Sequence, residues 1–194
     1  MSVGIVACGA IATHISSIQE RYGLDITIYP LPPLLHNSPK KIAGEVASVL
    51  VEIKSKHEKC AVAYADCGTY GALDEVILRH KVSRLGGNHC YDVFAGKKEI
   101  EEIIAATPGT YFLTDFLVKS FHRSVVVELG LDTRPELRDD YFKNYQSVVW
   151  LAQDPTEELE KEARAAAQLI GHPLTIKIVG DEKLAKEILR LVAD

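Results

Sequence analysis

Residues 60–74 read C-A-V-A-Y-A-D-C-G-T-Y-G-A-L-D, and residues 82–96 read V-S-R-L-G-G-N-H-C-Y-D-V-F-A-G. Both segments open with a short apolar run that is typical of a buried strand. Each run ends in a polar, glycine-bearing turn that contains a cysteine, Cys67 in the first segment and Cys90 in the second. The two segments therefore predict strands whose carboxyl ends carry thiols.

The same pattern opens the chain, where the apolar residues 3–7 are followed by Cys8 and a glycine. In open parallel sheets, ligands bind beyond the carboxyl ends of the strands. A thiol near a helix N-terminus is more acidic and more nucleophilic than a free thiol. We therefore expect Cys8, Cys67 and Cys90 to share a thiolate site at one edge of the sheet.

Strand-type runs alternate with amphipathic helical patterns along the whole chain. Strands are predicted at residues 3–7, 25–29, 61–65, 82–85, 110–113, 147–152 and 174–179. Helices are predicted at residues 11–22, 38–53, 70–80, 99–105, 134–145 and 156–170, with others starting at 114 and 181. This alternation implies crossover connections and predicts an α/β fold in three layers, a mostly parallel sheet with helices on both faces. The length of 194 residues suits a single domain over residues 1–194, or two related lobes that share one sheet.

Composition and motifs argue against several functions. The chain is 47% hydrophobic and 25% charged, as expected of a globular protein, and its net charge of -5 argues against nucleic acid as a partner. No G-x-G-x-x-G, no G-x-x-x-x-G-K-[ST] and no G-x-S-x-G occurs. Dinucleotide binding, P-loop nucleotide binding and serine hydrolysis therefore lose their usual support.

The location of the protein follows from its N-terminus. This segment has no basic region, and its apolar run is too short for a signal peptide or a membrane span, so we expect no membrane association and a cytoplasmic location. Thiols stay reduced there, which favours structural, catalytic or metal-binding roles for the four cysteines over two disulfides.

Three thiolates can form two kinds of inorganic site. One is zinc, with His89, His36 or water as the fourth ligand. The other is an iron–sulfur cluster with one iron left open for substrate. Cysteine is also a common core residue, and Cys60, at the other end of its strand, is interpreted in that way.

Two residues beside the cysteines are candidate catalytic groups. Asp66 precedes Cys67 and can orient a base, although a turn aspartate explains it equally well. His89 precedes Cys90 and can supply a proton or a ligand, although neighbouring residues of an extended chain point to opposite sides. The proline-rich loop at residues 30–37 is stiff and apolar, so we expect it to cover a pocket or to form an oligomer contact.

Longer motifs carry a resemblance to a known family. They are L-H-N-S-P at 35–39, D-C-G-T-Y-G at 66–71, G-G-N-H-C-Y-D-V-F-A-G at 86–96, P-G-T-Y-F-L-T-D-F-L at 108–117 and P-E-L-R-D-D-Y-F at 135–142. From Cys8 to about Gln153 the chain resembles the family catalogued as domain of unknown function 1638. The resemblance implies a role beside corrinoid-dependent methyl-transfer systems of anaerobic bacteria and archaea. One departure is Asp92, where the family pattern implies glutamate after H-C-Y.

Three hypotheses follow. The first is a metal- or iron–sulfur-binding protein with Cys8, Cys67 and Cys90 as ligands, an enzyme or accessory in anaerobic one-carbon or corrinoid methyl metabolism, with a corrinoid or methyltransferase protein as partner. The second is a metal-free enzyme in which Cys67 and Cys90 move a proton on a small acid, as in a racemase or isomerase. The third is a binding or assembly module that docks on a partner through the proline-rich loop and an acidic helix, with a homo-oligomer as one form of assembly.

Overall fold

The computed structural model describes residues 2–193, which divide into two compact units. Unit 1 comprises residues 2–93 and 181–193, and unit 2 comprises residues 94–180. Each unit has its own parallel sheet flanked by helices, which confirms the α/β class with helices on both faces of parallel strands. The strands pair in two separate sheets, one in each unit.

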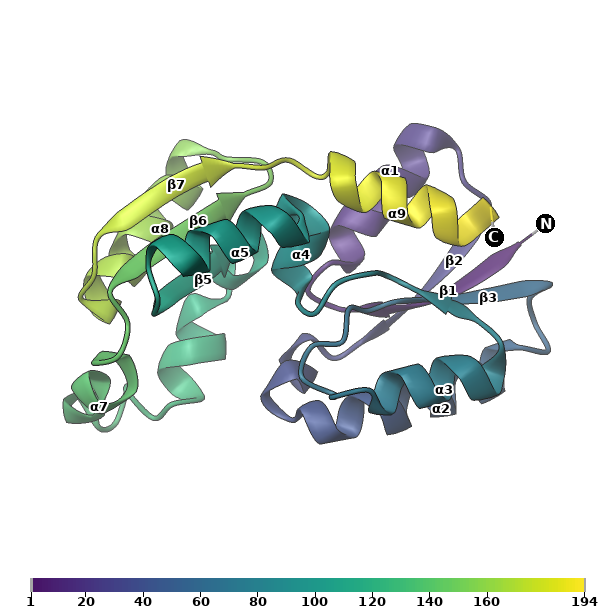
Figure 1. Cartoon of the computed structure of the whole chain (residues 1–194), viewed down its shortest axis with the longest axis horizontal. Helices are drawn as coiled ribbons and strands as arrows, with labels where there is room; N and C mark the ends of the chain where they lie inside the picture. The colour runs from purple at the N-terminus through teal and green to yellow at the C-terminus, as the bar shows by residue number, and fades with distance from the viewer. Residues whose placement is uncertain (1, 194) are drawn as a thin grey trace. The chain divides into compact units, whose positions relative to one another are not determined.

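Unit 1 holds the N-terminal half of the chain and the last helix (Figure 1). Its strands are β1 (Val3–Cys8), β2 (Ile26–Leu31), β3 (Lys59–Ala63) and β4 (Ser83–Arg84). Its helices are α1 (Ala12–Tyr22), the 3-10 helix η1 (Pro33–Asn37), α2 (Pro39–Ile53), α3 (Ala72–His80) and α9 (Glu182–Ala193). Helix α4 (Cys90–Ala95) begins in unit 1 and ends in unit 2.

The sheet of unit 1 has the strand order β2-β1-β3-β4, with all neighbours parallel. The chain builds outward from β1 to β2 and then crosses over β1 to place β3 on its other side. The direction of winding therefore reverses between β1 and β3, which is the topological switch point where open sheets of this kind bind ligands.

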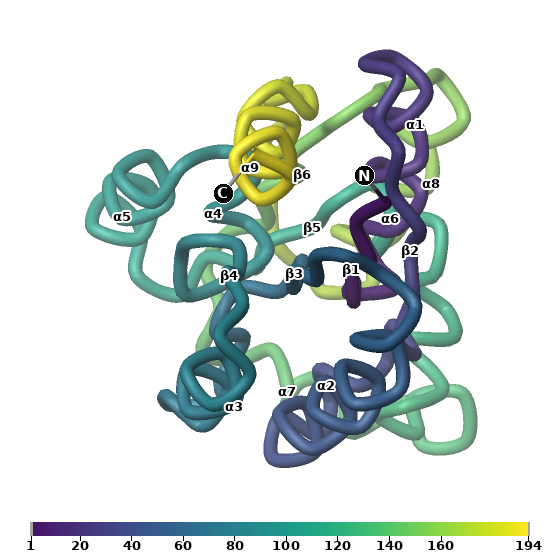
Figure 2. Tube along the Cα trace, turned by 90° about the vertical axis from the view of Figure 1, so that its right-hand side faces the viewer, coloured from purple at the N-terminus to yellow at the C-terminus, as the bar shows by residue number. Residues whose placement is uncertain are grey.

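Helices cover both faces of this sheet. Figures 1 and 2 show α2 and α3 on one face and α1 and α9 on the other. Helix α2 buries Ile42, Val46, Leu50 and Ile53. Their spacing of three and four residues places them on one face of the helix, which packs against β1 and β3. Because helices cover both faces of the sheet, β1 is buried along its whole length, as expected for a central parallel strand.

Unit 2 is built around a three-stranded parallel sheet of order β5-β6-β7. Its strands are β5 (Thr110–Thr114), β6 (Ser147–Ala152) and β7 (Leu174–Ile178). Its helices are α5 (Lys97–Ala106), α6 (Asp115–Lys119), the π-helix η2 (His122–Val127), the 3-10 helix η3 (Pro135–Leu137), α7 (Arg138–Phe142) and α8 (Glu157–Ile170). Helices α6 and α8 pack together over a core that includes the fully buried Trp150. Among residues 2–193, no helix combines the length and the apolar character that a membrane crossing requires.

Candidate metal centre

The candidate site lies at the carboxyl ends of β1 and β3 in unit 1. Cys8 is the last residue of β1 and is 1% exposed. Gly9 follows it and lets the chain approach the backbone of Leu31 and the ring of Pro33 more closely than a side chain would allow. This close approach seats helix η1, and with it His36, beside the end of β1.

The turn after β3 presents Cys67. Cys67 and Tyr70 both adopt left-handed backbone angles, with φ of 50° and 51°, which are uncommon outside glycine. Asp66 holds the turn, because its carboxylate accepts hydrogen bonds from the Thr69 hydroxyl at 2.6 Å and from the Tyr70 and Gly71 amides at 3.2 Å each. Strained backbone of this kind clusters at functional sites.

The hydrogen bonds of Asp66 also set its ionisation. Burial opposes the charged form, yet the bonds from Thr69, Gly71 and Tyr70 together hold the pKa of Asp66 below its ordinary value. The Asp66 carboxylate therefore accepts hydrogen bonds from the turn in which it lies. Its predicted catalytic role stays a prediction.

Cys90 is the first residue of helix α4. The buried Asp92 fixes this helix start, since its Oδ2 accepts hydrogen bonds from the Asn88 amide at 2.7 Å and the His89 amide at 3.1 Å. Gly87 has a φ of 89°, and a Cβ there would lie 2.7 Å from the Cβ of Asp92. Asp92 thus acts through the backbone that presents Cys90.

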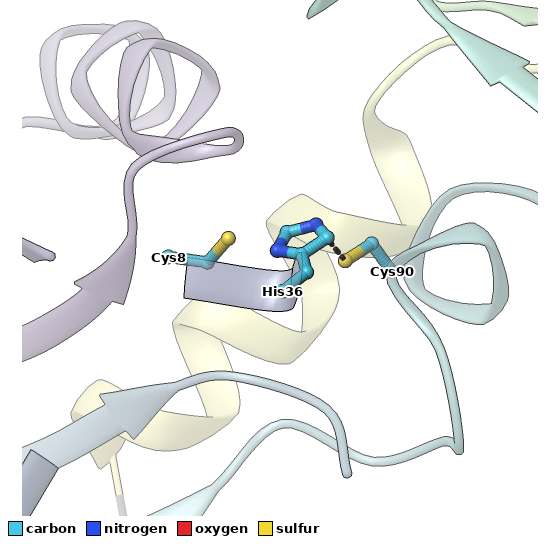
Figure 3. A group of neighbouring side chains, drawn as sticks. All are labelled: Cys8, His36 and Cys90. Carbon is cyan, nitrogen blue, oxygen red and sulfur yellow. Dashed lines mark hydrogen bonds between the residues drawn. The ribbon is translucent and has the colours of Figure 1, made fainter. Parts of the chain in front are cut away.

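Four side chains converge from these segments. One ligand atom from each of Cys8, His36 and Cys90 lies within 4.8 Å of the others, and Figure 3 shows the imidazole between the two sulfurs. The Cys90 sulfur lies 3.8 Å from Nε2 of His36. Cys67 adjoins the group, with its sulfur 3.6 Å from that of Cys90. These residues form a Cys/His/Cys group that could hold a metal, with Cys67 beside it.

The site makes one thiol more acidic than usual and favours the neutral form of the imidazole. The hydrogen bond from Cys90 lowers the pKa of Cys8, which outweighs the opposing effect of burial. The hydrogen bonds to Cys67 and Cys8, together with burial, raise the pKa of Cys90. Burial lowers the pKa of His36. A thiolate and a neutral imidazole are the forms in which these side chains bind metals.

Two buried polar atoms at the site have no hydrogen-bond partner among residues 2–193, Nδ1 of His36 and the hydroxyl of Tyr64. Tyr64 is fully buried, and burial and the neighbouring Cys8 raise its pKa, so its hydroxyl keeps its proton. Unpaired buried polar groups are costly, and they occur where a ligand, an ion or water completes the structure.

The structure separates the two histidines that the sequence offered as ligands. His36 joins the group, whereas His89 is exposed and its ring lies against Tyr91 at 5.6 Å between centroids. Tyr64 had no signal in the sequence, because a tyrosine in an apolar strand reads as a core residue. Cys60 is buried near the start of β3, in agreement with its interpretation as a core residue.

A family model described as "Protein of unknown function (DUF1638)" matches residues 30–188, well over half of the chain. The chain belongs to this family. No curated protein and no solved structure matches the chain. The DUF1638 match contains His36, Cys67 and Cys90 but begins after Cys8. It also extends past the resemblance noted in the sequence, which ends at about Gln153.

Proposed function

We propose that this DUF1638 protein binds one transition-metal ion, with Cys8, His36 and Cys90 as ligands and Cys67 in the fourth position. The proposal rests on the ligand atoms of Cys8, His36 and Cys90, which all lie within 4.8 Å of one another, and on Cys67, whose sulfur lies beside that of Cys90. Tetrahedral zinc, with bonds of about 2.3 Å to sulfur and 2.0–2.1 Å to nitrogen, places two sulfurs about 3.8 Å apart and a sulfur and a nitrogen about 3.6 Å apart. The corresponding separations here are 3.6 Å between Cys67 and Cys90 and 3.8 Å between Cys90 and His36.

Zinc is the ion that this donor set favours. Two or three thiolates with one imidazole suit a tetrahedral zinc site. An iron–sulfur cluster inserts several irons and sulfides between its cysteines and so needs thiolates that lie farther apart. When bound, zinc in such a site supplies Lewis-acid activation of a thiolate, a water or a substrate oxygen.

The chain's own residues have separate tasks in this proposal. Cys8 gives up its proton to a metal more readily than Cys90 does, because its pKa is lowered and that of Cys90 is raised in the metal-free protein. His36 needs no deprotonation, since burial already keeps its imidazole neutral. The Tyr64 phenol stays protonated and is available to donate a hydrogen bond to a thiolate or to a substrate oxygen.

The metal-free alternative fits the geometry less well. A proton-transfer pair would hold a substrate carbon between Cys67 and Cys90, yet their sulfurs are only 3.6 Å apart. That separation is about one van der Waals contact and leaves no space for another atom. A metal ion bonded to both sulfurs needs no such space.

We keep anaerobic one-carbon metabolism as the proposed setting, with the protein acting in the cytoplasm as an enzyme or an accessory of corrinoid-dependent methyl transfer. The family resemblance supports this setting, and thiolate ligands suit soft metals of such systems. Retention of a corrinoid or methyltransferase protein by the tagged chain in anaerobic extracts would support it. A chain that is recovered alone would count against it.

Elemental analysis of protein purified without oxygen tests the metal site. We expect about one metal ion per chain, lost in Cys8→Ser, Cys90→Ser and His36→Gln. Cys60→Ser is the matched control, because Cys60 is a buried cysteine outside the group. Absence of metal from the wild-type chain even after loading with zinc, or equal loss in the control, would refute the site.

A further inference from the structure

A second site lies at the opposite end of the sheet of unit 1. There the starts of β3 and β4 and the ends of α2 and α3 surround a cavity of about 590 Å³. Its charged lining consists of Lys54, Lys59, Arg79, Lys81 and one carboxylate, Glu58. We call this cavity the basic pocket. Its volume falls in the range of small-molecule sites, about 300–1,000 Å³.

The pocket carries an excess of positive charge although the chain as a whole is acidic, with a net charge of -5. Four permanently charged cations face one carboxylate. The ends of α2 and α3 each add about half a negative charge. The excess is therefore about two positive charges. Part of the positive charge of the lining balances the negative ends of the two helices. The positive charge that remains suits a dianion.

The positively charged side chains of the pocket are not neutralised by ion pairs. Lys54 donates to the backbone oxygen of His80, and Lys59 donates to that of Val192 at 2.8 Å. Arg79 and Lys81 make neither an ion pair nor a side-chain hydrogen bond with any residue of the described chain. The guanidinium of Arg79 and the ammonium of Lys81 therefore remain available to a ligand.

Lys81 occupies a position that glycine normally takes. It is the left-handed residue that ends α3, with a φ of 50°. The chain uses glycine at the same position after α1, at Gly23, and after α8, at Gly171. A left-handed lysine is strained relative to glycine, and such strain points to a use for the side chain.

The two histidines of the pocket complete its polar wall. Burial and the nearby Lys54 and Arg79 lower the pKa of His80, so it stays neutral and adds no charge. The ring of His57 is held on both sides, by Ser2 at Nδ1 and by Tyr29 at Nε2.

We propose that the basic pocket binds a phosphate dianion, either free or as the monoester of a small organic molecule, through Arg79 and Lys81. A phosphate monoester carries nearly two negative charges at neutral pH and three strong acceptor oxygens. Arginine binds such a group through two parallel N–H donors, and lysine binds it as a point charge. The cavity exceeds the size of the phosphate group and so leaves space for the organic part. This site is independent of the thiol site.

Calorimetric titration of the whole chain tests the pocket, with inorganic phosphate and ribose 5-phosphate as probes and ribose as the neutral comparison. We expect saturable binding of ribose 5-phosphate with a Kd of about 1 mM or below, and at least tenfold weaker binding in Arg79→Gln and Lys81→Gly. Lys81→Gly removes the charge while relieving the backbone, so its Tm should not fall. Equal binding of inorganic phosphate would show that the phosphate group alone is recognised.

The matched control is Lys40→Gln. Lys40 is exposed near the start of α2, about 21 Å along the helix from Lys54, and should leave the Kd unchanged. Three results would overturn the proposal. They are no saturable binding of either phosphate probe by the wild-type chain at about 10 mM, equal binding of ribose, and wild-type affinity in both pocket variants.

Discussion

His36 lies at the centre of the candidate metal site, and its ionisation links the site to pH. The half-buried imidazole has its Nε2 3.8 Å from the sulfur of Cys90, and its buried Nδ1 has no partner within the described chain. Burial lowers the pKa of His36 below its ordinary value of 6.5. In the metal-free protein the unfolded chain therefore takes up a proton at a higher pH than the folded chain does.

This difference predicts an acid-sensitive stability. The contribution of His36 to the free energy of unfolding of the metal-free protein is greatest above the ordinary histidine pKa. It falls as the pH drops below that value toward the lower pKa of folded His36. His36→Gln should flatten this dependence between about pH 7.5 and about pH 5.5. Urea unfolding at several pH values measures it. The exposed His89→Gln serves as control, and parallel curves for wild type and His36→Gln would contradict the account.

The sequence could predict part of the site at this scale. Cys8 ends β1 and Cys67 follows β3, and these strands pair side by side, so the convergence of the two thiols at one sheet edge follows from the parallel arrangement. The choice of His36 over His89 could not be predicted. It depends on the close approach at Gly9 that seats η1, which is a contact between segments far apart in the chain.

At the scale of elements, the start of α4 determines where Cys90 lies. The carboxylate of Asp92, the residue at which the chain departs from the family pattern, caps the backbone of Asn88 and His89. An aspartate three residues into a helix that reaches back to the preceding amides forms half of a capping box.

Removing this cap should weaken both the fold and the site. Asp92→Ala should lower the free energy of unfolding by about 1–2 kcal/mol, because two partly buried hydrogen bonds from backbone amides lose their acceptor. Asp92→Asn retains an acceptor oxygen and should cost less. Zinc affinity of Asp92→Ala should fall by about tenfold, as for other groups that orient metal ligands. Unchanged stability in urea and an unchanged zinc Kd would contradict this role.

Local patterns predicted most elements but not every detail. The Thr114 and Thr156 hydroxyls cap α6 and α8, as threonine followed by acidic residues predicts. Ser38 followed by Pro39 is a pattern that favours a capping hydroxyl at the start of α2, yet no such hydrogen bond forms. The backbone of Ser38, with ψ of 63°, directs the chain out of η1. A neighbouring 3-10 helix thus overrides the local signal.

At the scale of the whole molecule, the division into two sheets was not predictable from the pattern. Alternating strands and helices look the same in one sheet as in two, because pairing is decided by contacts between distant segments.

Each unit has its own buried polar centre. In unit 2, Oδ1 of Asp115 accepts from the indole of Trp150 at 2.8 Å and from the Gln153 amide at 3.1 Å, and Oδ2 accepts from the Asp154 amide at 2.7 Å.

This network predicts a change confined to one unit. Asp115→Asn should lower the free energy of unfolding by about 2–3 kcal/mol, because an amide cannot accept all three bonds. Trp150 is the only tryptophan of the chain, so its fluorescence during urea unfolding reports on unit 2. The zinc Kd should not change, since all the proposed ligands belong to unit 1. A loss of zinc affinity comparable to that of Cys90→Ser would contradict the independence of the site.

The most direct test of the metal centre is X-ray absorption at the edge of the metal that the anaerobically purified protein carries. We predict two or three sulfur neighbours at about 2.3 Å and an imidazole nitrogen at about 2.0–2.1 Å, and we expect Cys90→Ser to be purified without the metal and so to show no such spectrum. A shell made only of oxygen and nitrogen, or a spectrum unaffected by the loss of Cys90, would contradict a metal held by Cys8, His36 and Cys90.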